Sequence, residues 1–310
     1  MVSCGVTALT IALVDTEEGL VIFALGMMPT SSRNEPLERL RSLVPESWRA
    51  RLLSVVRLLR LVSDSRSYRE YRRLERVVDT THRGEPPASL RIRALRGTKV
   101  AVRPGTTDLL TLVDTFGWAY HAPPPDLDPH SFALVWDLGS NVGFTIAHLA
   151  QICPSARIIG VELDPENAAQ ARTNIAPWSD RCEIIEAAVW TDDGTLDYCR
   201  EAGQEWGFRV AALVAGEQAP NASASSISLN TLAQRASRRI DFVKMDIEGA
   251  ETHVLRENTE WAARVDSIKV EVHDPYTIED CAADLDVLGF ETARDLKHHA
   301  CVTGTRRSAA

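Results

Sequence analysis

The sequence lacks the features that mark several common classes of protein. Its 310 residues include six cysteines, and no two of them stand in a C-x-x-C or other metal-ligand spacing. A disulfide framework is therefore disfavoured, and the thiols fit a reduced, cytoplasmic protein. The apolar runs from Val2 to Val14 and from Gly19 to Met28 are too short for a membrane-spanning helix, and acidic residues separate them. No lysine or arginine precedes them, so a secretory signal is not predicted.

The first residues are predicted to lie outside the folded domain. Met27 and Met28 stand directly before the polar stretch PTSSRNEP. We therefore expect residues 1–34 to be a disordered extension or a misassigned start.

Positive charge is concentrated in the front of the chain. Between Ser31 and Arg103 there are 18 Lys and Arg against 8 Asp and Glu, whereas the chain from Pro104 onward has 16 against 32. Apolar residues recur every three or four positions from Glu35 to Val78, with arginines on the other face, so residues 35–84 are predicted to be a basic helical extension. Such a face could meet nucleic acid or an anionic membrane. We favour a solvated face that packs on the acidic body.

The rest of the chain alternates strands and helices. The stretch LRIRALRGTKVAVRPGTTD has the pattern of a hairpin with Gly97 near its turn, and the proline-rich segment HAPPPDLDPHS follows it. Beyond that, alternation predicts a parallel sheet covered on both faces. The last two strands, FETARDL and ACVTGT, are joined by few residues and must be antiparallel. The fold class is therefore α/β over residues 85–310: a Rossmann-like, doubly wound, mostly parallel seven-stranded sheet with an antiparallel last strand, preceded by the helical N-terminal region.

A glycine turn follows the first of these strands, in VWDLGSNVGF. Gly139 and Gly143 allow the backbone to turn tightly and to approach a ligand. Asn141 occupies the position where the dinucleotide fingerprint G-x-G-x-x-G needs its middle glycine, and no Gly-Lys-Ser/Thr follows. The turn is therefore not suited to a pyrophosphate.

Acidic residues beside the turn point to another ligand. Asp137 lies two residues before Gly139, where a carboxylate repels a phosphate and attracts an ammonium or sulfonium. Glu162 ends the second strand, where a carboxylate can accept both hydroxyls of a ribose. A cationic nucleoside without phosphate describes S-adenosylmethionine.

Longer motifs resemble a known family. The segments VWDLGSNVGF, IIGVELD, IDFVKMDIEGAE and IKVEVH, found in this order, resemble the FkbM-type branch of class I S-adenosylmethionine-dependent methyltransferases. The most specific segment is K-x-D-x-E-G-x-E, from Lys244 to Glu251. SSISLNTL resembles the family segment that precedes it, but Asn230 stands where the family usually has aspartate. The likeness extends from about Arg103 to Thr305.

The resemblance implies a role for each motif. The cofactor's amino-acid and sugar portions would lie against the glycine turn, and its ribose would contact the end of the second strand. Its adenine would lie at the end of the third strand, and its methyl group at the end of the fourth strand. The corresponding residues are Asp137, Gly139, Asn141 and Gly143 for the turn, Glu162 for the ribose, Ala187 or Ala188 for the adenine, and Asp246 for the methyl group. The segment EWGF, from Glu205 to Phe208, would close over the cofactor or meet the acceptor.

An alcohol acceptor must lose a proton, so a base is expected near the strand ends. The candidates are Asp246, Glu248, Glu251, Glu271 and His273, of which Asp246, Glu248 and His273 are predicted to be catalytic. His273 has an ordinary pKa near 6.5, which suits a base at neutral pH. Its other interpretation is a structural histidine beside Asp274. Glu248 and Glu251 begin a helix, where carboxylates are favourable whatever the function. These groups could together hold a divalent ion, but no octahedral set is evident and no metal is predicted.

The sequence therefore predicts an enzyme of class EC 2.1.1 with S-adenosylmethionine as cofactor. By the resemblance, it methylates a hydroxyl of a small molecule or glycan, such as a sugar or secondary metabolite. The alternative is a nucleic-acid methyltransferase that uses the arginine-rich front as a phosphate-binding arm. Against it, the body is acidic, and no Asn/Asp-Pro-Pro-Tyr/Phe/Trp follows the fourth strand. A nicotinamide-dependent oxidoreductase and a non-catalytic binding module are further alternatives, disfavoured by Asn141 and by the retained acids respectively.

Overall fold

The computed structural model describes residues 58–200, 203–205, 207–210, 219–295 and 297–307, together with two strands near the start. The chain divides into two units, residues 1–60 and 61–310. Each is described by itself.

In the first unit, strands β1 (Thr10–Thr16) and β2 (Gly19–Leu25) pair in antiparallel register, with Thr16 opposite Gly19. The sequence analysis did not predict this pair. The part of the predicted helical extension from 35 to 57 lies outside the described residues. The assignment of the start residue stays a prediction.

The second unit is built on a seven-stranded sheet. Its strands are β5 (Leu134–Leu138), β6 (Arg157–Glu162), β7 (Cys182–Glu186), β12 (Phe242–Met245), β13 (Ser267–Glu271), β14 (Phe290–Arg294) and β15 (Cys301–Arg306). Their order is β14-β15-β13-β12-β5-β6-β7, and β15 runs antiparallel to both of its neighbours. The predicted fold class, including the antiparallel last strand, is confirmed.

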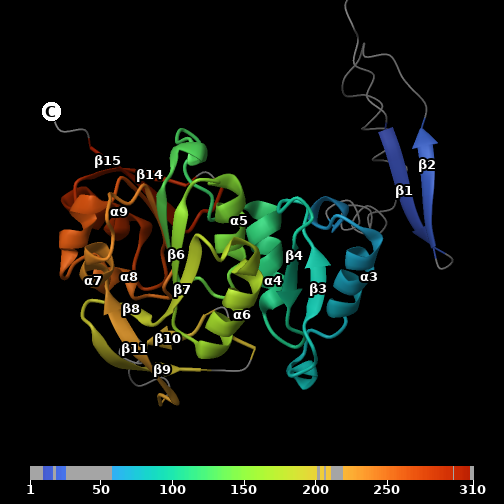
Figure 1. Cartoon of the computed structure of the whole chain (residues 1–310), viewed down its shortest axis with the longest axis horizontal. Coiled ribbons are helices and arrows are strands. Elements are labelled where there is room, and N and C mark those ends of the chain that lie inside the picture. Colours follow the sequence, from blue (N-terminus) through green and yellow to red (C-terminus); the bar gives the residue numbers. More distant parts are fainter. Residues whose placement is uncertain are drawn as a thin grey trace, which may run out of the picture. The chain divides into compact units, whose positions relative to one another are not determined.

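Helices cover both faces of this sheet (Figure 1). Those on one face are α5 (Phe144–Ile152) and α6 (Pro165–Ile175), and those on the other are α7 (Leu229–Gln234), α8 (Glu251–Val254) and α9 (Ile278–Val287). All five residues of β5 are buried, as expected of a central parallel strand. Val135 packs with Ile146 and other residues of α5, whereas Trp136 packs into the cluster on the opposite face, because successive side chains of a strand point to opposite sides.

The apolar pattern of the sequence predicts a third strand from Glu183 to Val189, but the structure has two strands here. β7 ends at Glu186, and β8 (Ala188–Trp190) belongs to a second sheet. That sheet has the order β10-β9-β11-β8, where the other members are β9 (Gly194–Cys199), β10 (Arg209–Val210) and β11 (Ala222–Ser228). Between β7 and β8, the Ala187 amide donates to the Glu162 carbonyl over 2.9 Å, so the junction is held at the carboxyl end of β6.

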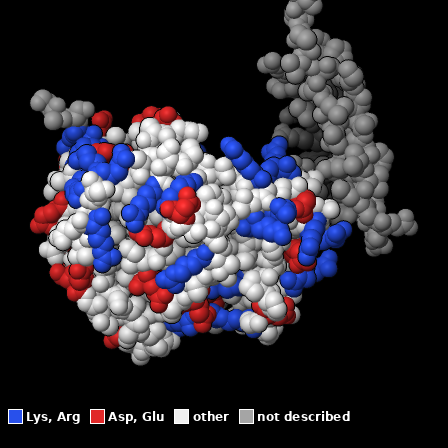
Figure 2. All heavy atoms as spheres, viewed as in Figure 1, with Lys and Arg blue, Asp and Glu red and all other residues white. Residues whose placement is uncertain are grey.

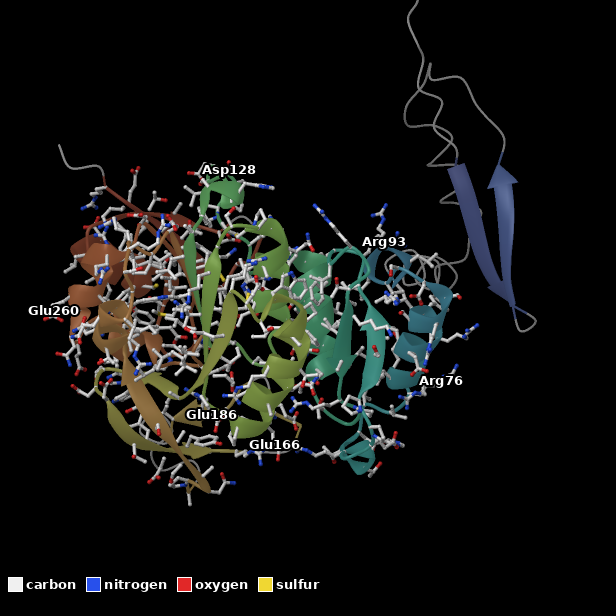
Figure 3. All side chains as sticks on the ribbon, in the orientation of Figure 1. Arg76, Arg93, Asp128, Glu166, Glu186 and Glu260 are labelled. Carbon is white, nitrogen blue, oxygen red and sulfur yellow. The ribbon has the colours of Figure 1, made fainter. Side chains whose placement is uncertain are left out.

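The arginine-rich part of this unit contains helix α3 and a hairpin. α3 spans Ser65–Leu74, and β3 (Ala88–Arg91) pairs antiparallel with β4 (Lys99–Val102), as predicted. Lys and Arg side chains gather over this region (Figure 2), and Arg76 and Arg93 extend outward from it (Figure 3). Short helical turns connect the remaining elements: η1 (Thr80–His82), α4 (Asp108–Val113), η2 (Asp114–Trp118), η3 (Pro129–Ser131), η4 (Ala176–Trp178) and η6 (Thr259–Arg264).

Ion pairs join the arginine-rich part to the sheet domain. The Arg103 guanidinium contacts the buried Asp108 carboxylate at 2.7 Å and also donates to the Asn167 side chain of α6. Arg83 contacts the buried carboxylate of Glu205 at 2.8 Å. These contacts place residues 61–103 against the sheet domain. Within the described residues, no helix is long and apolar enough to cross a membrane.

Candidate active site

A cavity of about 520 Å³ lies at the carboxyl ends of β5, β6, β12 and β13. The strand order reverses between β5 and β12, and ligands of doubly wound sheets bind at this kind of position. One end of the cavity is formed by the glycine turn and the end of β6. We call it the cofactor end. The other is formed by Trp118, Tyr120, Asp246, Glu248, Glu271, His273 and 297–299, and we call it the acceptor end.

Gly139 makes the close approach at the cofactor end. Its φ is +77°, and a Cβ there would lie 1.7 Å from the Asp246 carbonyl oxygen, so no other residue fits. The Lys244 ammonium donates to the Gly139 carbonyl over 2.9 Å. The turn after β5 is thus packed directly against the end of β12.

Glu162 forms the wall beside the turn. Its side chain is buried and accepts from the Asn141 amide at 2.7 Å and from the Asp164 amide at 2.9 Å. Burial raises the pKa of the Glu162 carboxyl to about 7, although the two amides act in the opposite direction. Asn141, with φ +47°, lines the cavity with Glu162 and donates from its side chain to the Glu205 carbonyl.

Two predicted cofactor residues lie behind the cavity surface. Asp137 is fully buried and does not line the cavity, and neither of its carboxylate oxygens has a hydrogen-bond partner among the described residues. The Lys244 ammonium lies 3.6 Å away, and burial raises the pKa of Asp137 to about 6. Gly143 has φ +77°, and a Cβ there would lie 2.9 Å from Ala171 Cα of α6. Its observed role is close helix packing.

The segments that the sequence predicts to flank the adenine and to close over the cofactor both line the cavity. Ala187 and Ala188 both line the cavity. Within EWGF, Glu205 and Phe208 are buried and line it too. The Glu205 carbonyl accepts from the side chains of Asn141 and Asn167, which ties this segment to the glycine turn.

His273 lies among three carboxylates at the acceptor end. Its Nδ1 is 3.2 Å from the Glu251 carboxylate, and its Nε2 is 3.5 Å from Glu248 and 3.6 Å from Asp246. Burial lowers the pKa of His273, but the Glu251 hydrogen bond and the surrounding negative charges outweigh it and raise the pKa to about 10. His273 is therefore protonated at neutral pH. In this charge state His273 has no free lone pair with which to act as a base, so the structure does not favour that role, and the catalytic assignment of His273 stays a prediction.

Glu248 and Glu271 hold protons more tightly than ordinary carboxyls. Burial and the charge of Asp246 raise the pKa of each to about 8. Glu251 is fully buried, and its two oxygens accept from the amides of Ile247 and Gly249. Glu251 therefore shapes the turn after β12 and does not line the cavity.

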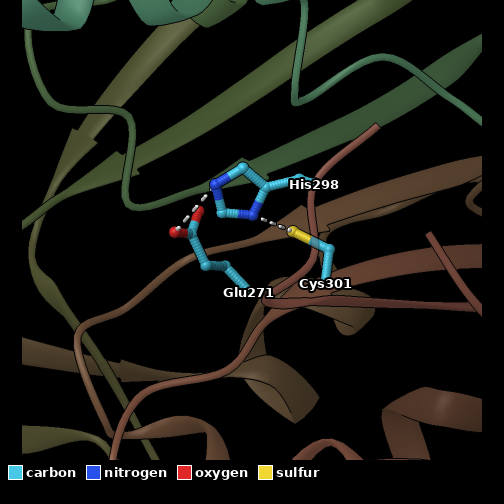
Figure 4. A group of neighbouring side chains, drawn as sticks. All are labelled: Glu271, His298 and Cys301. Atoms are coloured by element: carbon cyan, nitrogen blue, oxygen red, sulfur yellow. Dashed lines mark hydrogen bonds and ion pairs between the residues drawn. The ribbon is translucent and has the colours of Figure 1, made fainter. Parts of the chain in front are cut away.

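Two groups of side chains in the described residues bring donor atoms close enough to share a cation. They are Asp246, Glu271 and His273, and Glu271, His298 and Cys301. In the first group, the Lys244 ammonium lies 3.1 Å from Asp246 and His273 is itself cationic, so positive charge is already supplied. In the second, the His298 ring stands between Glu271 and Cys301 and turns a different nitrogen toward each (Figure 4). We assign no metal to either group.

The sequence analysis missed several residues of the acceptor end. Tyr120, Trp118 and the segment 297–299 line the cavity. For 297–299 the signal was available in the predicted topology: a parallel β14 followed by an antiparallel β15 puts their connecting loop at the carboxyl edge of the sheet. For Trp118 and Tyr120, which precede the strand–helix repeat, we find no such signal.

Comparison with known proteins gives the family of the chain. The methyltransferase FkbM domain matches residues 137–295. The chain belongs to the FkbM methyltransferase family.

Three individual proteins illustrate the similarity. The chain is 26% identical over 155 residues to the 2-O-methyltransferase NoeI of Sinorhizobium fredii, a match that covers 46% of this chain and 63% of the relative. It is 37% identical over 94 residues to a tRNA1(Val) (adenine(37)-N6)-methyltransferase of Porphyromonas gingivalis, covering 30% and 34%. An O-methyltransferase family protein from Burkholderia thailandensis aligns with 13% identity and a TM-score of 0.41 over 66% of this chain and 59% of that one. The chain thus spans less than two thirds of the length of both relatives.

Proposed function

We propose that this chain transfers a methyl group to a hydroxyl of a small-molecule or glycan acceptor. The observation that carries the proposal is the acceptor end of the cavity, where Asp246 and His298 offer an oxygen or nitrogen atom that can take a proton. A hydroxyl needs such a group because its proton must leave as the oxygen is methylated. The likeness to a 2-O-methyltransferase supports the same choice.

The residues at the cofactor end fit S-adenosylmethionine. The buried Asp137 carboxylate has no hydrogen-bond partner among the described residues, and Glu162 presents a carboxylate at the wall, so the region favours a ligand with positive charge and hydroxyl donors. Gly139, Asn141 and Glu162 would hold the cofactor, and Ala187 would flank its adenine. When bound, the cofactor supplies an activated methyl group on a good leaving group. The protein positions the acceptor, excludes water and accepts the acceptor's proton.

The test is an acceptor screen with radiolabelled S-adenosylmethionine. The purified full chain is incubated with neutral mono- and oligosaccharides, hydroxylated aromatic and polyketide-type compounds, nucleosides and tRNA. We expect label in a hydroxyl compound and its location on oxygen by mass spectrometry. Glu162→Ala, which removes the proposed ribose contact, is the negative control. Label only on nitrogen or in tRNA would contradict the proposal.

A second candidate function is methylation of a nucleic acid. It is favoured by the match to the tRNA methyltransferase and by the basic region around α3 and β3–β4. The turn after β12 argues against this function. Its sequence is Asp246-Ile-Glu-Gly, without the Pro-Pro-aromatic segment that is expected to hold a flipped base. Binding of tRNA at low salt, weakened by Arg93→Ala, would favour it. Absence of binding at low salt would remove it.

A further inference from the structure

We propose that His298 is the general base that accepts the acceptor's proton. The inference rests on the proposed transfer to a hydroxyl. His298 lines the acceptor end of the cavity and is partly buried, on the turn that connects β14 to β15. None of the family motifs in the sequence includes it.

The position of His298 relative to the glycine turn follows from a short series of contacts. The Lys244 ammonium, which donates to the Gly139 carbonyl, lies 6.0 Å from the centre of the Tyr120 ring. The centre of that ring is 5.8 Å from the centre of the His298 ring. One aromatic ring therefore separates His298 from the lysine that holds the turn, which places the imidazole beside the junction of the two ends of the cavity.

The contacts of His298 define which nitrogen can act. Nδ1 lies 3.3 Å from Cys301 Sγ, within hydrogen-bond distance for sulfur. Nε2 lies 3.9 Å from the Glu271 carboxylate, too far for a direct hydrogen bond (Figure 4). In the tautomer that donates Nδ1–H to Sγ, Nε2 keeps its lone pair and is available to a hydroxyl. Burial raises the pKa of the Cys301 thiol, so the sulfur carries no negative charge that would favour a protonated ring.

His273 and His298 differ in their charged neighbours. His273 contacts three carboxylates, whereas His298 has a mixture of charges around it. The groups that face His298 are Tyr120 from the segment after η2, Asp246 from the end of β12, Lys269 and Glu271 from β13, Asp295 and His299 from its own loop, and Cys301 from β15. Lys269 and Asp295 form a buried ion pair at 2.7 Å, so their opposite charges largely cancel at His298. Burial, His299 and Lys269 lower the pKa of His298, so the ring is neutral at neutral pH while His273 is protonated.

The proton transfer balances with no further reactant. The acceptor oxygen forms a bond to the methyl carbon as the carbon–sulfur bond of the sulfonium breaks. The electron pair of that bond stays on sulfur, and the hydroxyl proton passes to Nε2 of His298. Release of this proton to solvent restores the neutral ring. The route to solvent is short, because the adjacent residue His299 is exposed.

The first test needs no acceptor. The imidazole C2–H signals of the full chain are titrated by NMR with S-adenosylhomocysteine present, and the His298→Asn and His273→Asn variants assign them. We expect the pKa of His298 below 6.5 and that of His273 well above it. A His298 pKa above 7.5 would overturn the proposal, because the ring could not accept a proton at neutral pH.

The second test uses a hydroxyl acceptor identified by the screen. His298→Asn should lower kcat by at least about 100-fold and leave S-adenosylhomocysteine affinity unchanged. His130→Asn is the matched control, since His130 is exposed on η3 and does not line the cavity. In the wild type, kcat should fall as the pH drops through the pKa of His298, because only the neutral ring acts as base. That acidic limb should disappear in His298→Asn.

The outcomes separate the two proposals. Methylation of a hydroxyl with wild-type kcat in His298→Asn would overturn the role of His298 and keep the proposed function. An acidic limb near pH 8 that persists in the variant would assign the base to Glu248 or Glu271, again against His298. Methylation of no hydroxyl at all would overturn both.

Discussion

The cofactor end and the acceptor end of the cavity are built from different chemistry. At the cofactor end, backbone amides hold the Glu162 carboxylate and glycine allows the close approach of two strand ends. At the acceptor end, titratable side chains from β12, β13 and the 297–299 loop face one another. A site held by backbone geometry is recognisable as a motif, because only certain residues fit it. A site built from side chains of separate elements has no single local signature: at the acceptor end, Asp246 and Glu248 belong to a motif, whereas Tyr120 and the 297–299 loop do not.

The largest effect is expected at Gly139, where the two strand ends meet. Gly139→Ala should destabilise the chain by more than about 3 kcal/mol, because the new Cβ would overlap the Asp246 carbonyl and φ is positive. The measurement is denaturant unfolding together with calorimetric titration of S-adenosylhomocysteine. Gly194→Ala is the control: its Cβ would meet only Ser226 Oγ at 3.8 Å, so a change within about 0.5 kcal/mol is expected. Equal stability of the two variants would show that the close approach is not required.

A smaller effect is expected from the two acids at the cofactor end. Glu162→Ala should weaken binding of S-adenosylhomocysteine by about 1–3 kcal/mol, since a charged acceptor at the cavity wall is removed. Asp137→Ala should weaken it less, because Asp137 lies behind the wall and its charge is offset by Lys244. Calorimetry on both variants measures the difference, with the exposed Glu166→Ala as control. A larger loss for Asp137→Ala would place that carboxylate in direct contact with the ligand.

The pH is expected to change the free energy of unfolding through acids at both ends of the cavity. Folding raises the pKa of Glu162 to about 7 and of Glu248 and Glu271 to about 8, so between pH 4.5 and 8 the folded chain binds more protons than the unfolded chain. The free energy of unfolding should therefore decrease as the pH rises through this range. His273, with its pKa raised to about 10, adds stability below 6.5 that is lost as the pH rises through 10. Both contributions have the same sign.

We expect the melting temperature to fall between pH 6 and pH 9, because the folded chain holds protons at these groups that the unfolded chain releases. Glu271→Gln should flatten this dependence, because the amide does not ionise. Thermal unfolding by circular dichroism at fixed ionic strength measures it. A melting temperature that rises with pH would mean that the acceptor-end carboxyls are ionised in the folded chain at lower pH than the structure indicates.

Sequence reasoning predicted most of the sheet but misplaced one strand. The run from Glu183 to Val189 reads as one strand, and its division between two sheets depends on pairing with β6 on one side and β11 on the other. The hairpin around Gly97 and the antiparallel β15 were predictable because short connections allow few arrangements. Residues 35–57 of the predicted helical extension lie outside the described part of the chain.

At the site, the sequence identified positions better than it identified their roles. Gly143 and Gly139 look alike in the sequence, yet one packs α5 against α6 and the other faces Asp246. The ordinary pKa of histidine suits a base, but three carboxylates that follow β12 lie beside His273 and favour its protonated form. His298 lay in a loop with no motif. A pKa depends on distances between groups far apart in the chain, and these distances are set only by folding.

The sequence alone therefore determined the order of strands and helices, the glycine turn, and the acids that favour a cationic nucleoside, since local periodicity and backbone constraint act within a few residues. The tertiary structure decided which acids reach the cavity surface, which charges surround His273 and His298, and which loop lines the acceptor end. These depend on burial and on charges brought together from β12, β13 and β15, and no short segment of the chain contains that information.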